Sequence, residues 1–188
     1  MLRYWIIAAI VLLSLDLGVG RWWFLNRKEK RFDAQILSAS SRYGVDPSLV
    51  KAVVWKESNF DPDARGTAGE VGLMQIRALA AQEWATSEKL RSVSEYDLTD
   101  PETNTLAGTW YLSKLLRRYR HTDNPLPYAL ADYNAGRGNV LKWLSGAALT
   151  NHAAFIEQIG FPSTKQYVHL VGEKLVRYRA TKTPPRDR

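Results

Sequence analysis

KESNFDPDARGTAGEVGLMQI, residues 56–76, is the stretch that most constrains the rest of this 188-residue chain. It begins where an apolar helix is expected to end, with the carboxylate of Glu57 at that end. A glycine-rich loop follows and leads into GLMQI, residues 72–76, where the pattern predicts the start of a second helix. A single glutamate at a helix end is usually a solvated surface charge, so the meaning of Glu57 depends on its surroundings.

Helix signals occur on both sides of this stretch. Asp46-Pro47 supplies an N-cap and a proline at the first helical position, and apolar residues then recur at helical spacing towards Glu57. Further helices are expected over residues 32–44, over residues 79–84, after Asp100-Pro101, and from Ser163 as N-cap with Gln166 as its capping-box partner. No strand pattern competes, so the sequence predicts an all-α fold.

Three groups of residues carry a family resemblance. They are, in order, Glu57-Ser58, Phe60-Asp61-Pro62, Ala64 and residues 72–76 in the first, Tyr133-Asn134-Ala135-Gly136 in the second, and Tyr167-Val168 in the third. Together they resemble the signature of the lytic transglycosylases of the soluble-transglycosylase type, whose fold is similar to goose-type lysozyme. The resemblance extends over residues 33–178, and separated motifs in register rarely match by chance.

This resemblance implies a lysozyme-like helical domain with a groove and one catalytic acid, Glu57. The acid would protonate the oxygen of the MurNAc–GlcNAc β-1,4 bond of peptidoglycan and then take a proton from the muramic acid 6-hydroxyl, giving a 1,6-anhydro end without water. Glu57 must begin protonated, so we expect Phe60, Met74 and Tyr133 to surround it and raise its pKa. Two alternatives stay open, a hydrolytic muramidase on the same fold and a weakly catalytic docking subunit of a larger envelope assembly.

The resemblance also assigns residues to the substrate site. Ser58 would hydrogen-bond and orient Glu57, Asn134 would brace the loop, and Tyr167 would close the groove from the last helix. Asp61, Asp63 and Glu70 stay open as second carboxylates, although Asp61-Pro62 is more typical of a turn. The full set of expected substrate-binding residues is Ser58, Met74, Gln75, Tyr133, Asn134 and Tyr167.

The chain departs from the family pattern at three positions. Gly66 stands where family members often carry a serine, Arg77 follows the MQI run where an apolar residue is usual, and Ser163 replaces a glutamate that often begins the third motif. These departures concern substrate contacts more than the acid. Arg77 is expected either to meet a carboxylate of the wall polymer or to face solvent.

Composition narrows the classes of protein. Apolar residues make up 45% and aromatic residues 11%, which indicates one globular domain with a core. There is no cysteine, and the three histidines have no ligand spacing, so we expect no metal and no cofactor. The net charge of +7 favours an anionic partner such as the wall polymer or a membrane face. The chain lacks a concentrated basic recognition motif, which argues against nucleic acid as the partner.

Residues 1–25 are predicted to form a signal peptide or a membrane anchor. Tyr4 to Leu15 is almost wholly apolar, and Trp22-Trp23-Phe24 is typical of an aromatic belt at a membrane surface. We favour an uncleaved inner-membrane anchor with the domain in the periplasm, although basic residues after the span favour the cytoplasm. Because the enzyme motif is the stronger signal, we place the domain in the periplasm. A charged linker (26–31), the catalytic domain (32–180) and a basic tail (181–188) complete the expected organisation.

Overall fold

The computed structural model describes residues 27–182, which form helices and turns. No strand occurs among these residues, and their only bridges are the isolated pairs Arg65 with Val71 and Val71 with Ile76. The all-α prediction is therefore confirmed. The predicted anchor lies outside the described residues, and the helices that the structure does describe include none with the length and apolar character needed to cross a membrane.

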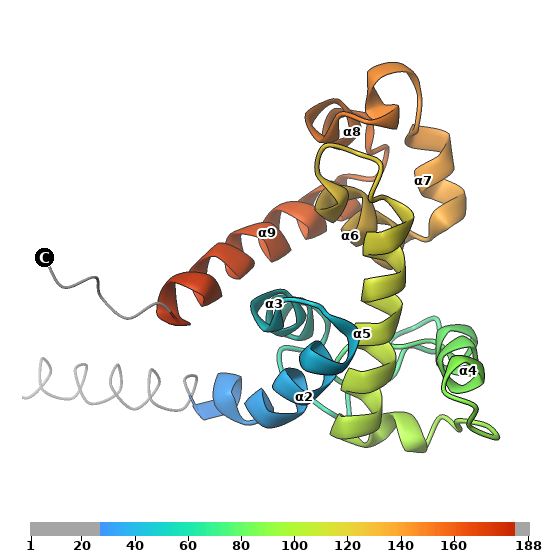
Figure 1. Cartoon of the computed structure of the whole chain (residues 1–188), viewed down its shortest axis with the longest axis vertical. Coiled ribbons are helices and arrows are strands. Elements are labelled where there is room, and N and C mark those ends of the chain that lie inside the picture. The colour runs from blue at the N-terminus through green and yellow to red at the C-terminus, as the bar shows by residue number, and fades with distance from the viewer. Residues whose placement is uncertain (1–26, 183–188) are drawn as a thin grey trace, which may run out of the picture.

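One long central helix organises the others. The elements are α2 (Asp33–Tyr43), α3 (Pro47–Ser58), α4 (Ala78–Ser87), η1 (Asp97–Thr99), α5 (Pro101–Arg118), α6 (Pro125–Ala135), α7 (Arg137–Trp143), η2 (Gly146–Leu149), α8 (His152–Gln158) and α9 (Pro162–Lys182). Helix α5 passes through the molecule, with α2 and α4 packed on it near one end and α6 near the other (Figure 1). Helices α7 and α8 pack on α6, and α9 returns to contact both α6 and α3.

Helix starts follow the local signals in the sequence. The side chain of Asp46 accepts a hydrogen bond from Ser48 N at 2.8 Å, and that of Asp100 accepts one from Thr103 N at 2.8 Å, each before a proline at the first helical position. Both predicted starts are confirmed. Helix α9 begins at Pro162, so its N-cap position is Phe161, and the predicted N-cap at Ser163 is wrong by two residues. Proline at the first turn costs no hydrogen bond, which explains this earlier start.

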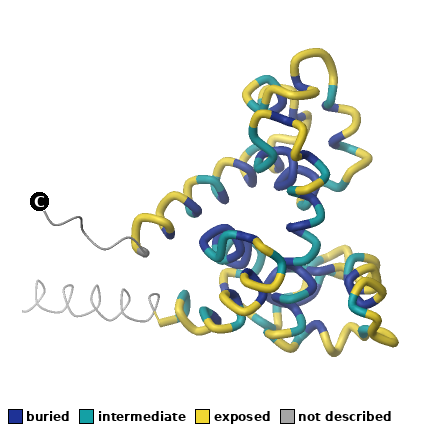
Figure 2. The backbone as a smooth tube through the Cα atoms, viewed as in Figure 1, coloured by how far each residue is buried: buried dark blue, intermediate teal, exposed yellow. Residues whose placement is uncertain are grey.

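Helices α3 and α9 run antiparallel and are joined by side chains at both ends. Arg179 Nε lies 2.7 Å from Asp46 Oδ2 at the start of α3, and the Tyr167 hydroxyl donates to Glu57 Oε1 at 2.6 Å at the other end. Between these contacts α3 is deeply buried, with residues 52–54 wholly inaccessible. The buried segments of the helices face inward while their outer surfaces are exposed (Figure 2). The acid therefore stands at the end of a firmly packed helix.

The expected helix start at residues 72–76 is wrong. Gly72 and Gln75 have φ values of 76° and 48°, in the left-handed region that interrupts a right-handed helix. Residues 71–76 instead form a tight turn, closed by two hydrogen bonds between the main chains of Val71 and Ile76. The next helix, α4, begins only at Ala78.

A single buried amide on α5 holds this turn. Asn104 is 1% exposed, its Oδ1 accepts from Met74 N at 2.8 Å, and its Nδ2 donates to the carbonyl oxygens of Val71 and Leu98, each at 2.8 Å. This amide satisfies the Met74 N–H and the Leu98 carbonyl, which would otherwise be buried without partners, and it gives Val71 O a second hydrogen bond beside the one from Ile76 N.

Replacing Asn104 with alanine should therefore destabilise the fold by about 2–4 kcal/mol, because two buried main-chain groups lose their partner and a third loses one of its two hydrogen bonds. Chemical denaturation monitored by circular dichroism measures this change. The matched control is Asn139→Ala on α7, which removes a half-buried side-chain hydrogen bond to Ala135 O and an exposed one from Lys142 Nζ. Equal losses of stability in the two variants would contradict the role given to Asn104.

Candidate active site

A groove of about 600 Å³ opens beside the carboxyl end of α3. Its walls come from the loop that follows α3, the first half of α4, the middle of α5 and the end of α6. It therefore collects segments that are far apart in the sequence. The lining residues are Glu57, Gly66, Thr67, Glu70, Gln75, Ile76, Arg77, Leu79, Ala80, Glu83, Tyr111, Asp132, Tyr133, Asn134, Ala135 and Gly136.

Glu57 is half-buried at one side of this groove and carries a perturbed carboxyl. Burial raises its pKa to about 7; the hydrogen bond from Tyr167 and the charge of Lys56 act to lower the pKa, and the charge of Glu70 acts to raise it. A large fraction of Glu57 is consequently protonated at neutral pH. A proton on a carboxyl facing a groove is the requirement for a general acid.

Two tyrosines fix the surroundings of the acid. The Tyr167 hydroxyl donates to Glu57 Oε1, and the Tyr133 hydroxyl donates to the main-chain oxygen of Met74 at 2.8 Å. Burial and the nearby Glu57 charge hold the pKa of both tyrosines well above the ordinary value, so each remains a hydrogen-bond donor. The ring of Tyr133 also packs against Tyr111, with centroids 5.6 Å apart.

Ser58 lies next to the acid but does not make the expected contact. Its hydroxyl is within hydrogen-bond distance of Leu73 O, at 2.9 Å, and of Val54 O, at 3.2 Å. The prediction that Ser58 hydrogen-bonds Glu57 is thus corrected, because successive residues point to different faces of a helix. Ser58 instead ties the end of α3 to the turn of residues 71–76.

Met74 is also placed differently from the expectation. Its side chain is wholly buried, and it occupies the space beside Gly108, where an added Cβ would lie 2.4 Å from Met74 Sδ. Only its main-chain oxygen takes part in the site, as the acceptor for Tyr133. Met74 does not line the groove, and it acts on the site only through this hydrogen bond to Tyr133.

Gln75 and Asn134 reach the groove itself. Gln75 Nε2 donates to Ala64 O and Gly72 O, both at 3.0 Å, which fixes the plane of the amide. Asn134 Oδ1 accepts a hydrogen bond from Thr164 Oγ1 at 2.8 Å, so it links the end of α6 to the first turn of α9. These contacts hold the turn of residues 71–76 and the end of α6 in place beside the groove.

The groove also contains polar residues that the sequence did not single out. Glu83, Tyr111 and Asp132 line it together with Glu70, which the sequence had left open as a second carboxylate. Asp132 is 1% exposed and accepts hydrogen bonds from Arg118 at 2.6 Å and Tyr119 at 2.8 Å, so it is a buried structural group. These residues lie at ordinary helix positions, and only the meeting of α4, α5 and α6 brings them to the groove.

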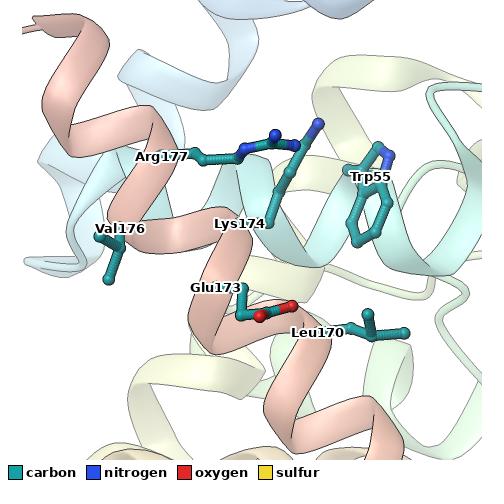
Figure 3. A pocket seen from close by; sticks show the side chains of 6 residues that line it. All are labelled: Trp55, Leu170, Glu173, Lys174, Val176 and Arg177. Carbon is teal, nitrogen blue, oxygen red and sulfur yellow. The ribbon is translucent and has the colours of Figure 1, made fainter.

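A second hollow lies on the outer side of α3 and α9 (Figure 3). The Lys174 ammonium lies 4.8 Å from the centre of the Trp55 ring there and 3.0 Å from Glu29 Oε1. The other lining residues come from α9 alone, and Glu57 is not among them. No group of three or more histidines and carboxylates capable of holding a metal occurs between residues 27 and 182.

Comparison with known proteins agrees with this fold. A model of the transglycosylase SLT domain matches residues 34–156, and the chain belongs to this family. The soluble lytic murein transglycosylase of Salmonella typhimurium is 33% identical over 158 residues, 79% of this chain and 23% of that protein. Membrane-bound lytic murein transglycosylase F of Desulfosudis oleivorans is 37% identical over 113 residues, 58% of this chain and 23% of that protein.

Two solved structures share the fold. The 70 kDa soluble lytic transglycosylase of Escherichia coli superposes with a TM-score of 0.71 at 30% identity, over 86% of this chain and 26% of that chain. An inactive mutant of the lytic transglycosylase Slt of Pseudomonas aeruginosa gives 0.71 at 30% identity, over 81% and 25%. The expected lysozyme-like helical fold is confirmed. The chain spans about a quarter of the length of these relatives.

The raised pKa of Glu57 makes a prediction about stability. A carboxyl whose pKa is raised on folding binds its proton more tightly in the folded state, so stability falls as pH rises from about 4.5 to about 7. Glu57→Gln removes this ionisation. The variant should gain about 2–3 kcal/mol over the wild type between pH 4 and pH 8, as measured by urea unfolding at each pH. A constant difference across this range would contradict a buried, protonated Glu57.

The Tyr167 hydrogen bond makes a second prediction. Because it stabilises the ionised carboxylate, Tyr167→Phe should raise the pKa of Glu57 by about one unit, the equivalent of one hydrogen bond. Titration of the labelled glutamate carboxyl carbon by NMR measures the shift. Tyr133→Phe is the control, because its hydroxyl donates to Met74 O instead of to the acid. Similar shifts in both variants would point to a general change of burial.

Proposed function

We propose that this chain is a peptidoglycan lytic transglycosylase that cleaves the MurNAc–GlcNAc β-1,4 bond without water. The observation that carries the proposal is Glu57 itself, a carboxyl with a pKa of about 7 that faces a groove. The names of the relatives support it, since each is called a lytic murein transglycosylase or lytic transglycosylase.

The reaction uses one acid twice. Glu57 gives its proton to the glycosidic oxygen as the bond from that oxygen to the anomeric carbon of the muramic acid breaks. The resulting carboxylate then takes the proton of the muramic acid 6-hydroxyl, whose oxygen bonds to the anomeric carbon. The products are a 1,6-anhydro end and a free hydroxyl on the departing sugar, and Glu57 is again protonated.

The pKa of about 7 suits both steps, because an acid and a base are both most effective when the pKa is near the working pH. Tyr167 supports the second step, since its hydrogen bond favours the carboxylate that forms when the proton has left. Asp61 and Asp63 are exposed and do not line the groove, so neither is assigned to the reaction.

The substrate site is assigned to the groove. Gln75, Tyr133 and Asn134 are proposed to contact the sugars, while Ser58 and Met74 act through the positions of the turn and of Tyr133. The 70-kDa soluble lytic transglycosylase, a structural relative, has been solved in complex with bulgecin A, and we take this as support for ligand binding by this chain. The proposed partner is therefore the glycan strand of peptidoglycan, with no cofactor.

We also propose a location in the cell envelope. The relatives include soluble and membrane-bound lytic transglycosylases, and the apolar residues of the first 25 positions fit a signal or an inner-membrane anchor. In this proposal the catalytic domain comprises residues 32–180 and works in the periplasm, alone or within a larger envelope assembly.

Digestion of purified peptidoglycan by the full chain, followed by mass spectrometry of the muropeptides, tests the function. Anhydro-terminated products are expected, and Glu57→Gln should reduce their rate of release by at least about 100-fold, because the general acid is lost. Glu102→Gln, an exposed position on α5 outside the groove, is the matched control and should keep the wild-type rate. Reducing ends one water heavier would identify a hydrolase instead, and no release by the wild type would favour a docking subunit.

A further inference from the structure

The turn between Gly66 and Glu70 has no room for a side chain at position 66. A Cβ built on Gly66 would lie 2.2 Å from Glu70 Oε2, 2.8 Å from Glu70 Cβ and 2.9 Å from Gln75 Oε1. All three distances are too short for a Cβ contact, so the Glu70 carboxylate occupies the space that a side chain at position 66 would fill. The glycine at 66 and the carboxylate at 70 are parts of one arrangement.

The loop holds this carboxylate in a fixed position. Glu70 Oε2 accepts a hydrogen bond from the main-chain N–H of Ala68 at 3.0 Å, and Arg77 Nε lies 3.8 Å from Glu70 Oε1. The main chain is fixed as well, because Gly66 N donates to Glu70 O at 2.8 Å. The Glu70 side chain is 26% exposed and lines the groove that also contains Glu57. Because the Glu70 side chain is already ordered, a ligand that donates a hydrogen bond to its carboxylate costs little side-chain entropy on binding.

The amide of Gln75 presents a second acceptor to the same place. Its Nε2 donates to Ala64 O and Gly72 O, so the nitrogen must face these two carbonyls and Oε1 must face away from them. Gln75 Oε1 then points towards Gly66 and the Glu70 carboxylate. Two acceptors, one of them charged, converge on one wall of the groove.

We propose that Glu70 and Gln75 Oε1 form an acceptor pair that binds a hydrogen-bond donor of the amino sugar, either a hydroxyl or the acetamido N–H. Glu70 is thereby a specificity-determining residue of this chain. The inference rests on the proposed function, since it assigns a contact within the same groove. An ionised carboxylate can accept hydrogen bonds but cannot donate them, so a sugar with an ether or ester oxygen in place of the donor is disfavoured at this position.

The charge of Glu70 also affects the acid. Its removal lowers the pKa of Glu57, whose other titratable or charged neighbours are Tyr167, Lys56 and Tyr133. The loss of Glu70 should therefore weaken substrate binding and also move the upper limb of the pH profile to lower pH.

The test compares three variants of the full chain by their kinetics on solubilised peptidoglycan glycan strands. Glu70→Gln should raise KM about 10-fold and change kcat by less than about 3-fold, because a charge-assisted hydrogen bond is lost. Gly66→Ala should raise KM similarly, since its Cβ displaces the carboxylate while Glu70 remains. Glu95→Gln is the control, because Glu95 is exposed and pairs with Arg65 at the base of the same loop, outside the groove. It should keep the wild-type KM.

Binding without catalysis separates this inference from the proposed function. In the Glu57→Gln background, an NMR titration with the β-1,4 tetramer of N-acetylglucosamine should show about 10-fold weaker binding when Glu70→Gln is added. This result supports the acceptor pair even if the wild type releases no product. Equal affinity with and without Glu70→Gln, or an equal loss with Glu95→Gln, would overturn it. Circular dichroism verifies folding, and Glu70→Asp, which withdraws the charge by one methylene, replaces any variant that fails to fold and should also weaken binding.

Discussion

The hydrogen bond between Tyr167 and Glu57 joins residues 110 positions apart, and the chemistry of the site depends on it. Glu57 occupies the last turn of α3, where its own neighbours would leave it in water. The antiparallel pairing with α9 buries the carboxyl and supplies the hydroxyl that stabilises its ionised form. Burial and the hydrogen bond act on the pKa in opposite directions, and burial is the larger influence. The pKa of Glu57 therefore depends on how the helices pack around it.

The opposite wall of the site depends on α5. Asn104 fixes the turn of residues 71–76 through two hydrogen bonds and joins it to Leu98 through a third, and Gly108, one turn along, leaves room for Met74 to enter the core. The main-chain oxygen of Met74 in turn accepts a hydrogen bond from the Tyr133 hydroxyl. A buried polar network of this kind is fully effective only when every member is satisfied. The contacts that fill the core therefore also position this wall of the groove.

Much of this architecture could be predicted from local signals. The Asp-Pro pairs at 46 and 100 specify helix starts within a few residues, and the spacing of apolar residues identifies the buried face of α3. The turn at Gly72 was missed because left-handed conformations at Gly72 and Gln75 leave no periodic signal. The contact of Ser58 with Leu73 and the positions of Glu83 and Tyr111 at the groove depend on tertiary packing. Such packing leaves no local pattern in a single sequence.

The distance along the chain between Glu57 and Tyr167 has a consequence for synthesis. The polypeptide leaves the ribosome from its N-terminus, so α3 is exposed well before α9 exists. Until α9 has docked, Glu57 lacks the hydrogen bond from Tyr167 and the burial that the packing of α9 contributes. The nascent chain therefore carries the complete surroundings of this acid only when α9 is in place.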